Sequence, residues 1–151
     1  IDTDYVAIHD ADLEYYPEDL SKMYKKIDDN NLILGSRFIG NNERNNIYKR
    51  TLYANYFLSG LFSLIFGTKI TDVATCYKMM PSDFFRTFNI KSSGFEFEIE
   101  VLANFLKYNK TISEVPINYS GRSYSEGKKI KTIDGFKYIY WMFKTRLWEE
   151  N

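Results

Sequence analysis

The sequence contains few of the residues that mark secreted and membrane-spanning proteins. Cys76 is the only cysteine among 151 residues, so an internal disulfide is excluded, and no signal peptide opens the chain. We therefore expect a reducing, cytoplasmic environment. Long apolar runs are also missing. The densest one, residues 52–67, is too short and too interrupted by polar residues to predict a membrane span, and a buried or membrane-surface helix fits it better.

The chain also lacks net charge. Twenty basic and twenty acidic residues cancel, and an isoelectric point near 6.8 gives little support for nucleic-acid binding. The charges are nevertheless uneven, because residues 1–30 hold nine acidic and three basic side chains whereas residues 31–80 hold six basic and two acidic ones. An acidic cluster that could hold a metal, faced by basic segments, is expected for a polyphosphate substrate.

The length and the apolar content of 44% predict one globular α/β domain. The predicted strands are residues 4–9, 32–36, 73–80 and 111–119. Pro116 marks the last of them as an edge strand or a bulge. The predicted helices begin at Pro17 and Pro81 or cover residues 47–66, 94–109 and 132–148. We expect the polar segment 39–46 to be a mobile loop.

The predicted C-terminal helix, residues 132–148, is amphipathic. Its apolar stripe consists of Ile133, Phe136, Tyr140, Phe143 and Leu147. Most simply, such a stripe packs against the core. The same helix also carries Lys137, Lys144, Arg146, Trp141 and Trp148, which would suit a helix lying on a membrane surface.

Three acidic residues follow the first predicted strand. Asp10, Asp12 and Glu14 are spaced two apart, so in an extended segment their side chains point to the same side. Carboxylates crowded together repel one another unless a cation lies between them, which makes a bound divalent metal the first hypothesis. A surface turn before the helix at Pro17 is the alternative.

The position of these acids also bears on domain organisation. In open α/β sheets the ligand lies at the carboxyl ends of strands, in a crevice that needs strands on both sides. Only nine residues precede Asp10. The chain therefore looks like the second half of a larger α/β domain, beginning at the strand that carries the metal ligands.

Five stretches, in this order along the chain, resemble the motifs of the family 2 glycosyltransferases, in the branch similar to dolichol-phosphate mannose synthase and bacterial polyprenyl-phosphate glycosyltransferases. They are "DADLEYYPEDL", "GSRF", "TDVATCYKMM", "FEFEIEVL" followed by "ISEVPINY", and "RSYSEGKKIKTIDG". An Asp-x-Asp alone occurs by chance in many proteins. Five motifs in sequence, spanning residues 4 to about 146, are specific.

The resemblance implies a GT-A fold with a mixed, mostly parallel sheet flanked by helices. It also implies a nucleotide-sugar donor, a Mg²⁺ or Mn²⁺ ion, and a polyprenyl phosphate or similar acceptor at the membrane face. Members of the family begin with a strand and a Pro-x-x-Asn-Glu type segment that hold the base and ribose. Nothing here corresponds to them, so we expect residues 1–151 to form a single, partial GT-A domain.

The family's site residues can be placed on this sequence one by one. Asp10 and Asp12 match the Asp-x-Asp motif, and Glu14 stands where the mannose synthases usually have Gln. Arg37 and Arg50 match arginines that handle the acceptor phosphate. Two further basic residues match those of the closing loop before the last helix, namely Arg122 and Lys128.

The chemistry of sugar transfer explains why such residues would be needed. A divalent metal held by a few carboxylates neutralises the charge that builds on the departing diphosphate. Asp12 is the first choice as direct ligand, Asp10 could bind through water or touch the ribose, and Glu14 could complete the shell. Fixed positive charge from Arg37 and Arg50 would offset the repulsion between two anionic substrates. Ordinary surface arginines are the alternative.

A general base is needed only for some acceptors. A phosphate oxygen is already ionised, whereas an alcohol must lose a proton. If the acceptor is a hydroxyl, the candidates for the base are Asp72, Glu96 and Glu98. The two glutamates, with Glu100, could equally be the solvated flank of a helix.

Together these features predict a metal-dependent, inverting hexosyltransferase that moves a sugar from a nucleotide-sugar donor to a polyprenyl phosphate at the cytoplasmic face of a membrane. Two alternatives remain. One is a transferase of the same fold that acts on a saccharide hydroxyl, and the other is a non-catalytic fragment that binds a partner or a membrane. The predicted substrate-binding residues are Asp10, Glu14, Arg37, Arg50, Asp72, Glu98, Arg122 and Lys128.

Overall fold

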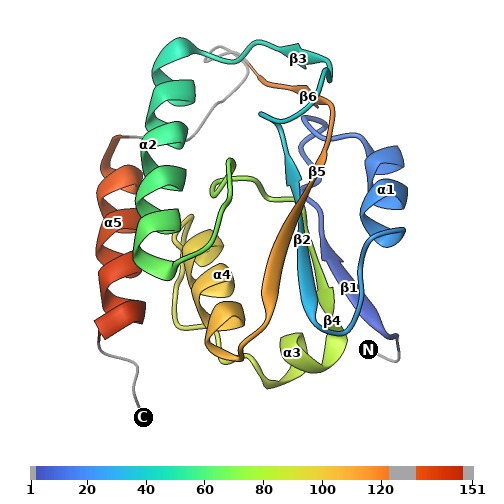
Figure 1. Ribbon diagram of the computed structural model, residues 1–151. Helices are drawn as coiled ribbons and strands as arrows, with labels where there is room; N and C mark the ends of the chain where they lie inside the picture. Colours follow the sequence, from blue (N-terminus) through green and yellow to red (C-terminus); the bar gives the residue numbers. More distant parts are fainter. Residues whose placement is uncertain (1–2, 123–131, 148–151) are drawn as a thin grey trace.

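The computed structural model describes residues 3–122 and 132–147, which form a mixed sheet with helices on both faces (Figure 1). The four strands are β1 (Tyr5–Ile8), β2 (Asn31–Ser36), β4 (Lys78–Pro81) and β5 (Thr111–Pro116), in the order β1-β4-β2-β5. β2 pairs parallel with β5, whereas β4 is antiparallel to both β1 and β2. Three strands therefore share one direction, and the predicted mixed α/β fold is confirmed.

A second, smaller sheet lies beyond the ends of β2 and β5. It consists of β3 (Arg44–Asn45) and β6 (Tyr119–Ser120), which pair parallel. The segment predicted as a mobile loop therefore contributes a strand. The predicted strand 111–119 is divided in two between Pro116 and Tyr119, and β5 lies at the sheet edge, as Pro116 indicated. The division brings Tyr119 beside Arg44, in the segment that leads into the helix α2 (Lys49–Phe66).

The helices are η1 (Pro17–Asp19), α1 (Leu20–Tyr24), α2 (Lys49–Phe66), α3 (Ser82–Thr87), α4 (Phe97–Lys107) and α5 (Thr132–Leu147). Gly67, with φ 66°, ends α2 in the left-handed conformation that glycine tolerates best, as predicted. In Figure 1, α2, α4 and α5 lie on one side of the sheet and α1 lies on the other. The strand predicted for residues 73–80 is shorter than expected, because β4 begins only at Lys78.

Hydrophobic side chains fill both sides of the sheet. Successive residues of a strand point to opposite faces, so Leu32 and Leu34 pack into the core beneath α2, α4 and α5, while Ile33 packs into the core beneath α1. All six residues of β2 are buried. β2 thus ends in the interior of the protein, and Arg37, the residue that follows it, is buried too.

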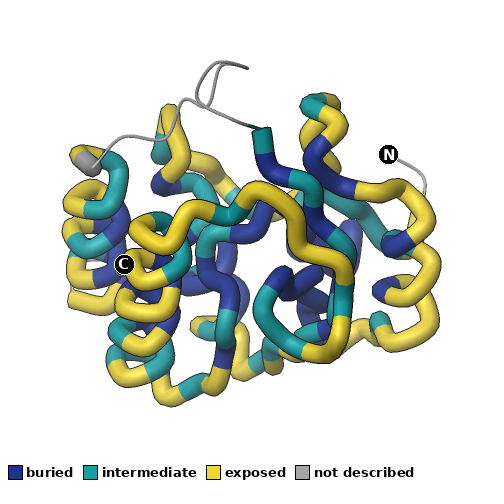
Figure 2. The backbone as a smooth tube through the Cα atoms, turned by 90° about the horizontal axis from the view of Figure 1, so that it is seen from above, coloured by how far each residue is buried: buried dark blue, intermediate teal, exposed yellow. Residues whose placement is uncertain are grey.

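The apolar stripe of α5 does not face the core, and this expectation is corrected. Phe136 is 66% exposed, and the other four residues of the stripe are exposed as well. The buried positions are instead Tyr138, Trp141, Met142 and Thr145, which recur at helical spacing and face α2 and α4. Figure 2 shows exposed backbone along the outer side of the helical layer and buried strands inside. Among the described residues, no helix combines the length and hydropathy needed to cross a bilayer.

Candidate active site

The acidic segment after β1 is a turn and not an extended strand. β1 ends at Ile8, residues 11–14 bend, and Leu13 has a φ of 62° in the left-handed region. The prediction that Asp10, Asp12 and Glu14 share one side of an extended segment is therefore wrong. Asp10 is exposed, while Asp12 and Glu14 are brought together by a residue far along the chain.

That residue is Arg122. Its Nη2 lies 2.8 Å from Asp12 Oδ2, its Nε lies 3.1 Å from Glu14 Oε1, and its backbone N–H donates to the same Glu14 oxygen at 2.8 Å. The repulsion between two of the three carboxylates is thus relieved by a guanidinium group. The cation that lies between Asp12 and Glu14 in the structure is thus a side chain of the protein.

Glu14 is the most firmly held of the three acids. Its second oxygen accepts a hydrogen bond of 2.8 Å from the Tyr119 hydroxyl, and the residue is buried. Burial by itself opposes ionisation, but the hydrogen bonds from Arg122 and Tyr119 outweigh it and lower the pKa of Glu14. Glu14 is therefore ionised at neutral pH and fixes the end of β6 to the acidic turn.

The acidic turn offers few oxygen donors to a metal ion. Among residues 3–122 and 132–147, no group of three His, Cys, Asp or Glu side chains is placed to hold a metal ion. Hard divalent cations such as Mg²⁺ often take only one or two carboxylates and complete their shell with substrate phosphates and water. The oxygen donors of Asp10 and Asp12 suit that smaller set, so their role as metal ligands stays a prediction.

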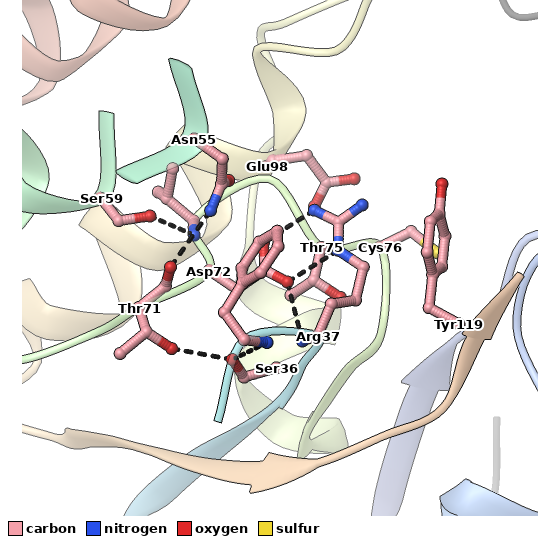
Figure 3. A network of polar contacts seen from close by, with 12 residues as sticks. Ser36, Arg37, Asn55, Ser59, Thr71, Asp72, Thr75, Cys76, Glu98 and Tyr119 are labelled. Atoms are coloured by element: carbon pink, nitrogen blue, oxygen red, sulfur yellow. Dashed lines mark hydrogen bonds and ion pairs between the residues drawn. The ribbon is translucent and has the colours of Figure 1, made fainter. Parts of the chain in front are cut away.

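A second arginine, Arg37, lies at the end of β2 and forms a buried ion pair with Asp72 (Figure 3). Its Nε and Nη2 each lie 2.7 Å from a different oxygen of Asp72, and its backbone N–H adds a bond of 3.0 Å. Burial disfavours the charged guanidinium, yet the adjacent carboxylate outweighs that cost and holds the pKa of Arg37 well above its ordinary value. Arg37 therefore stays protonated in the interior, and Asp72 balances its charge.

Asp72 is positioned by neighbours on both sides. Its backbone N–H and that of Thr71 donate to Glu114 Oε1 at 3.1 and 2.9 Å. The Thr71 hydroxyl lies 2.8 Å from that of Ser36. Glu114 belongs to the edge strand β5, so three segments of the chain fix the ion pair. Asp72 was a candidate base, and the structure makes it instead the partner that holds Arg37.

Arg37 and Arg50 line the same cavity, of about 530 Å³. Its walls come mainly from α2 and α5 and are largely apolar, and they include Phe57, Phe136 and Tyr138. The Arg37 guanidinium lies 5.0 Å from the centroid of the Tyr119 ring, and Tyr119 also lines the cavity. The two arginines predicted to handle a phosphate thus lie at one apolar cavity.

The glutamates at the start of α4 are not a solvated flank. Glu98 forms an ion pair with Lys78, a fully buried lysine that also donates to the Thr75 carbonyl. Burial lowers the pKa of Lys78 to about 7. Glu100 is buried and accepts two backbone N–H bonds of 2.9 Å, from Lys91 and Ser92.

Glu96 is buried as well, and one of its oxygens has no hydrogen-bond partner within the described residues. None of the three glutamates lines the cavity that Arg37 and Arg50 share. Their geometry therefore does not single out a base for a hydroxyl acceptor.

Several residues of the site lie within the motif stretches but were not predicted as site residues. Tyr119 joins the two arginine pairs, since its hydroxyl bonds Glu14 and its ring lies beside Arg37. Tyr15 stacks on Tyr77 at 4.7 Å, and the Tyr77 hydroxyl bonds His9 at 2.6 Å. Tyr15, Tyr77 and Tyr119 each lie in one of the quoted motif stretches, but among thirteen tyrosines nothing in the sequence indicated which side chains meet at the site. Lys128, predicted for the closing loop, lies outside the described residues.

Comparisons with known proteins bear on the resemblance. The chain is 25% identical over 135 residues to an undecaprenyl-phosphate mannosyltransferase of Micrococcus luteus, covering 87% of this chain and 56% of that protein. It is 26% identical over 150 residues to a dolichol-phosphate mannosyltransferase of Pyrococcus furiosus, covering 97% of this chain and 42% of the relative.

A low-salt glycan biosynthesis hexosyltransferase of Haloferax volcanii is 25% identical over 142 residues, which make up 92% of this chain and 34% of that protein. The chain thus spans about half or less of the length of these relatives. The family model described as glycosyl transferase family 2 matches residues 1–92. The chain belongs to glycosyl transferase family 2, as its motifs predicted.

Proposed function

We propose that this chain belongs to an inverting glycosyltransferase that moves a sugar from a nucleotide-sugar donor to a polyprenyl phosphate. The observation that carries the proposal is the cavity of about 530 Å³, which combines apolar walls with Arg37 and Arg50. A polyprenyl phosphate needs both features, because its chain is apolar and its head is anionic. Two of the relatives carry names of polyprenyl-phosphate mannosyltransferases, which supports the same acceptor class.

The residues have distinct parts in this reaction. An acceptor phosphate oxygen attacks the anomeric carbon, the bond from that carbon to the diphosphate breaks, and the nucleoside diphosphate leaves with the electron pair. Arg37, held in place by Asp72, does not titrate and offers the phosphate the guanidinium N–H groups that Asp72 does not take. Arg50 is exposed in the first turn of α2 and completes the grip on the phosphate from the cavity wall.

A divalent metal would neutralise the charge on the leaving diphosphate. We propose Mg²⁺ or Mn²⁺ at Asp10 and Asp12, with phosphate oxygens and water as the remaining ligands. Glu14 already accepts three hydrogen bonds from Arg122 and Tyr119. Glu14 therefore holds the acidic turn and the end of β6 together. The substrate-binding role of Lys128 stays a prediction.

A saccharide hydroxyl is the less supported acceptor. It would need a general base, yet both oxygens of Asp72 accept from Arg37 and Glu98 is engaged by Lys78. A phosphate acceptor needs no base and uses the two arginines directly. No contact in the described residues favours a purely structural module over an enzyme.

We further propose that α2 and α5 form the face that contacts the membrane, at its cytoplasmic side. Phe57 and Phe136 both line the cavity and are 63% and 66% exposed, so the apolar wall continues onto this outer face. The charged residues of the two helices are five basic and one acidic: Lys49, Arg50, Lys137, Lys144, Arg146 and Asp134. Exposed aromatic rings with basic neighbours suit the headgroup region of an anionic bilayer.

Binding of farnesyl phosphate, a short polyprenyl phosphate, tests the acceptor site. Isothermal titration calorimetry should show binding to the chain and about tenfold weaker binding to Arg50→Ala, because a charge-assisted contact is lost. Arg146→Ala removes an equal charge from the exposed end of α5 and should bind as the parent does. Farnesol binding as tightly as farnesyl phosphate would contradict the phosphate grip.

The membrane face can be tested by flotation with vesicles of phosphatidylcholine alone or mixed with phosphatidylglycerol. The anionic vesicles should carry the chain, and Phe136→Ser with Phe143→Ser should release it. Tyr24→Ser with Tyr108→Ser, two exposed rings on other elements, serves as the matched control. Equal flotation of both double variants would contradict the assignment of this face.

A further inference from the structure

Arg122 binds one of the two Asp12 oxygens through which a metal would bind. Asp12 Oδ2 accepts from Arg122 Nη2 at 2.8 Å, and Asp12 Oδ1 accepts from the backbone N–H of Glu14 at 3.2 Å. Both oxygens of the first-choice ligand are therefore engaged. Each oxygen keeps a second lone pair, but a divalent cation at Asp12 would lie beside the Arg122 guanidinium and be repelled by it, so the two cations compete. The guanidinium is the donor that can leave without unfolding the turn.

The ion pair between Arg122 and Asp12 is open enough for another cation to replace the guanidinium. The Arg122 side chain is 37% exposed and that of Asp12 is 22% exposed, so water and salt reach the pair. A divalent ion has twice the charge of a guanidinium and concentrates it in a smaller radius, which favours it at a carboxylate. Metal can therefore replace the side chain at modest cost.

The backbone at Arg122 would stay in place during this exchange. Its N–H donates to Glu14 Oε1 at 2.8 Å, and the Ser120 N–H donates to the Glu14 carbonyl at 2.9 Å. The Tyr119 hydroxyl holds the other oxygen of Glu14. A guanidinium released from Asp12 therefore remains tethered beside the acidic turn, on a fixed stretch of chain.

We propose that Arg122 is an internal counter-ion of Asp12, which the divalent metal displaces, so that metal binding frees the guanidinium to contact the donor's diphosphate. This inference rests on the metal site of the proposed function and adds an order of events to it. Without metal the acids are neutralised by the protein itself. With metal the same arginine becomes a positioning residue for the anionic donor.

Titration with Mn²⁺, followed by the electron paramagnetic resonance signal of the free ion, tests the exchange. Because the competitor is removed, Arg122→Ala should bind Mn²⁺ about fivefold more tightly than the parent chain. Arg146→Ala changes the net charge equally and should leave the affinity as it is. Asp12→Ala should lose binding.

Equal or weaker Mn²⁺ binding by Arg122→Ala, with binding retained in the parent, would overturn the exchange and leave the metal site standing. Binding by neither chain would overturn the exchange together with the metal site. The farnesyl phosphate titration would then still judge the acceptor site by itself.

A second measurement on the unaltered chain needs no variant. In ¹H–¹⁵N spectra of arginine side chains, Mg²⁺ should shift the Nη2 signal of Arg122, which donates to Asp12, and increase its exchange with water. The Nη2 signal of Arg37, bonded to Asp72, should stay unchanged. An Arg122 signal that Mg²⁺ leaves unmoved would contradict the displacement.

Discussion

The molecule contains two arginine–carboxylate clusters that differ in burial. Arg37 and Asp72 are both buried and meet through two side-chain bonds of 2.7 Å. Arg122 is partly exposed and divides its contacts between Asp12 and Glu14. A buried ion pair cannot be separated without leaving a charge in the interior, whereas a pair that water reaches can open. The first cluster suits a fixed charge, and the second suits exchange with another ion.

Tyr119 connects the two clusters. Its hydroxyl donates to Glu14, and its ring lies 5.0 Å from the Arg37 guanidinium. Each end of the site is thus held by the same side chain, which comes from the short strand β6. The buried and the exposed ion pairs therefore belong to one connected network. Substitutions in this network should show which of the contacts are permanent and which can be exchanged.

Asp72→Ala should have the largest effect. It leaves the buried Arg37 guanidinium without its partner, and we expect a loss of about 3–5 kcal/mol in the free energy of unfolding, measured by urea denaturation. Asp83→Ala is the matched control, since Asp83 pairs with Arg86 on the surface and should cost less than about 1 kcal/mol. A loss of similar size in both variants would contradict the expected extra cost of breaking a buried ion pair.

Glu14→Gln should have an intermediate effect, and one that depends on pH. The variant removes the charge that the Arg122 and Tyr119 bonds stabilise, so we expect a loss of about 1–2 kcal/mol at pH 7. Because the folded-state pKa of Glu14 is lowered, its stabilisation is present above the ordinary value of 4.5 and is lost as pH falls through the folded pKa.

Unfolding curves of the parent and of Glu14→Gln, measured between pH 7 and pH 2.5, should therefore converge at the acidic end. If the two free energies of unfolding differ by the same amount over this range, the stabilisation does not depend on the charge of Glu14.

Arg122→Ala should have the smallest effect. The pair is screened by solvent, so we expect a loss below about 1 kcal/mol that disappears in 1 M salt, where the Debye length is about 3 Å. The loss from Asp72→Ala should persist in the same salt. Thermal denaturation at low and high salt makes the comparison, and a salt-resistant loss at Arg122 would place it with the permanent contacts.

The sequence predicted much of the fold because local signals determine much of it. Pro17 begins a helical turn, Gly67 ends α2, and the apolar run of β2 is buried on both faces as such runs usually are. The family followed from motifs that need no structure to be recognised. These features depend on residues close together in the chain.

The partners of the charged residues could not be predicted, because they lie far apart in the chain. Arg122 contacts Asp12 across 110 positions, and Arg37 contacts Asp72 across 35. The exposed stripe of α5 shows a related limit. Periodicity tells which residues share a helix face, but the neighbouring elements decide which face is covered, and here they cover the one with Trp141.

The pairing of β2 with β5 has a consequence for the arginine at the cavity. In the observed alignment Leu34 lies opposite Glu114, whose carboxylate receives the backbone N–H groups of Thr71 and Asp72. A shift of β5 by one residue would turn Glu114 toward the opposite side of the sheet and leave the N–H groups of Thr71 and Asp72 without this acceptor. The register of the edge strand β5 therefore helps to position Asp72 and, through it, the Arg37 guanidinium. A chain that folded with β5 out of register would misplace this arginine at the cavity.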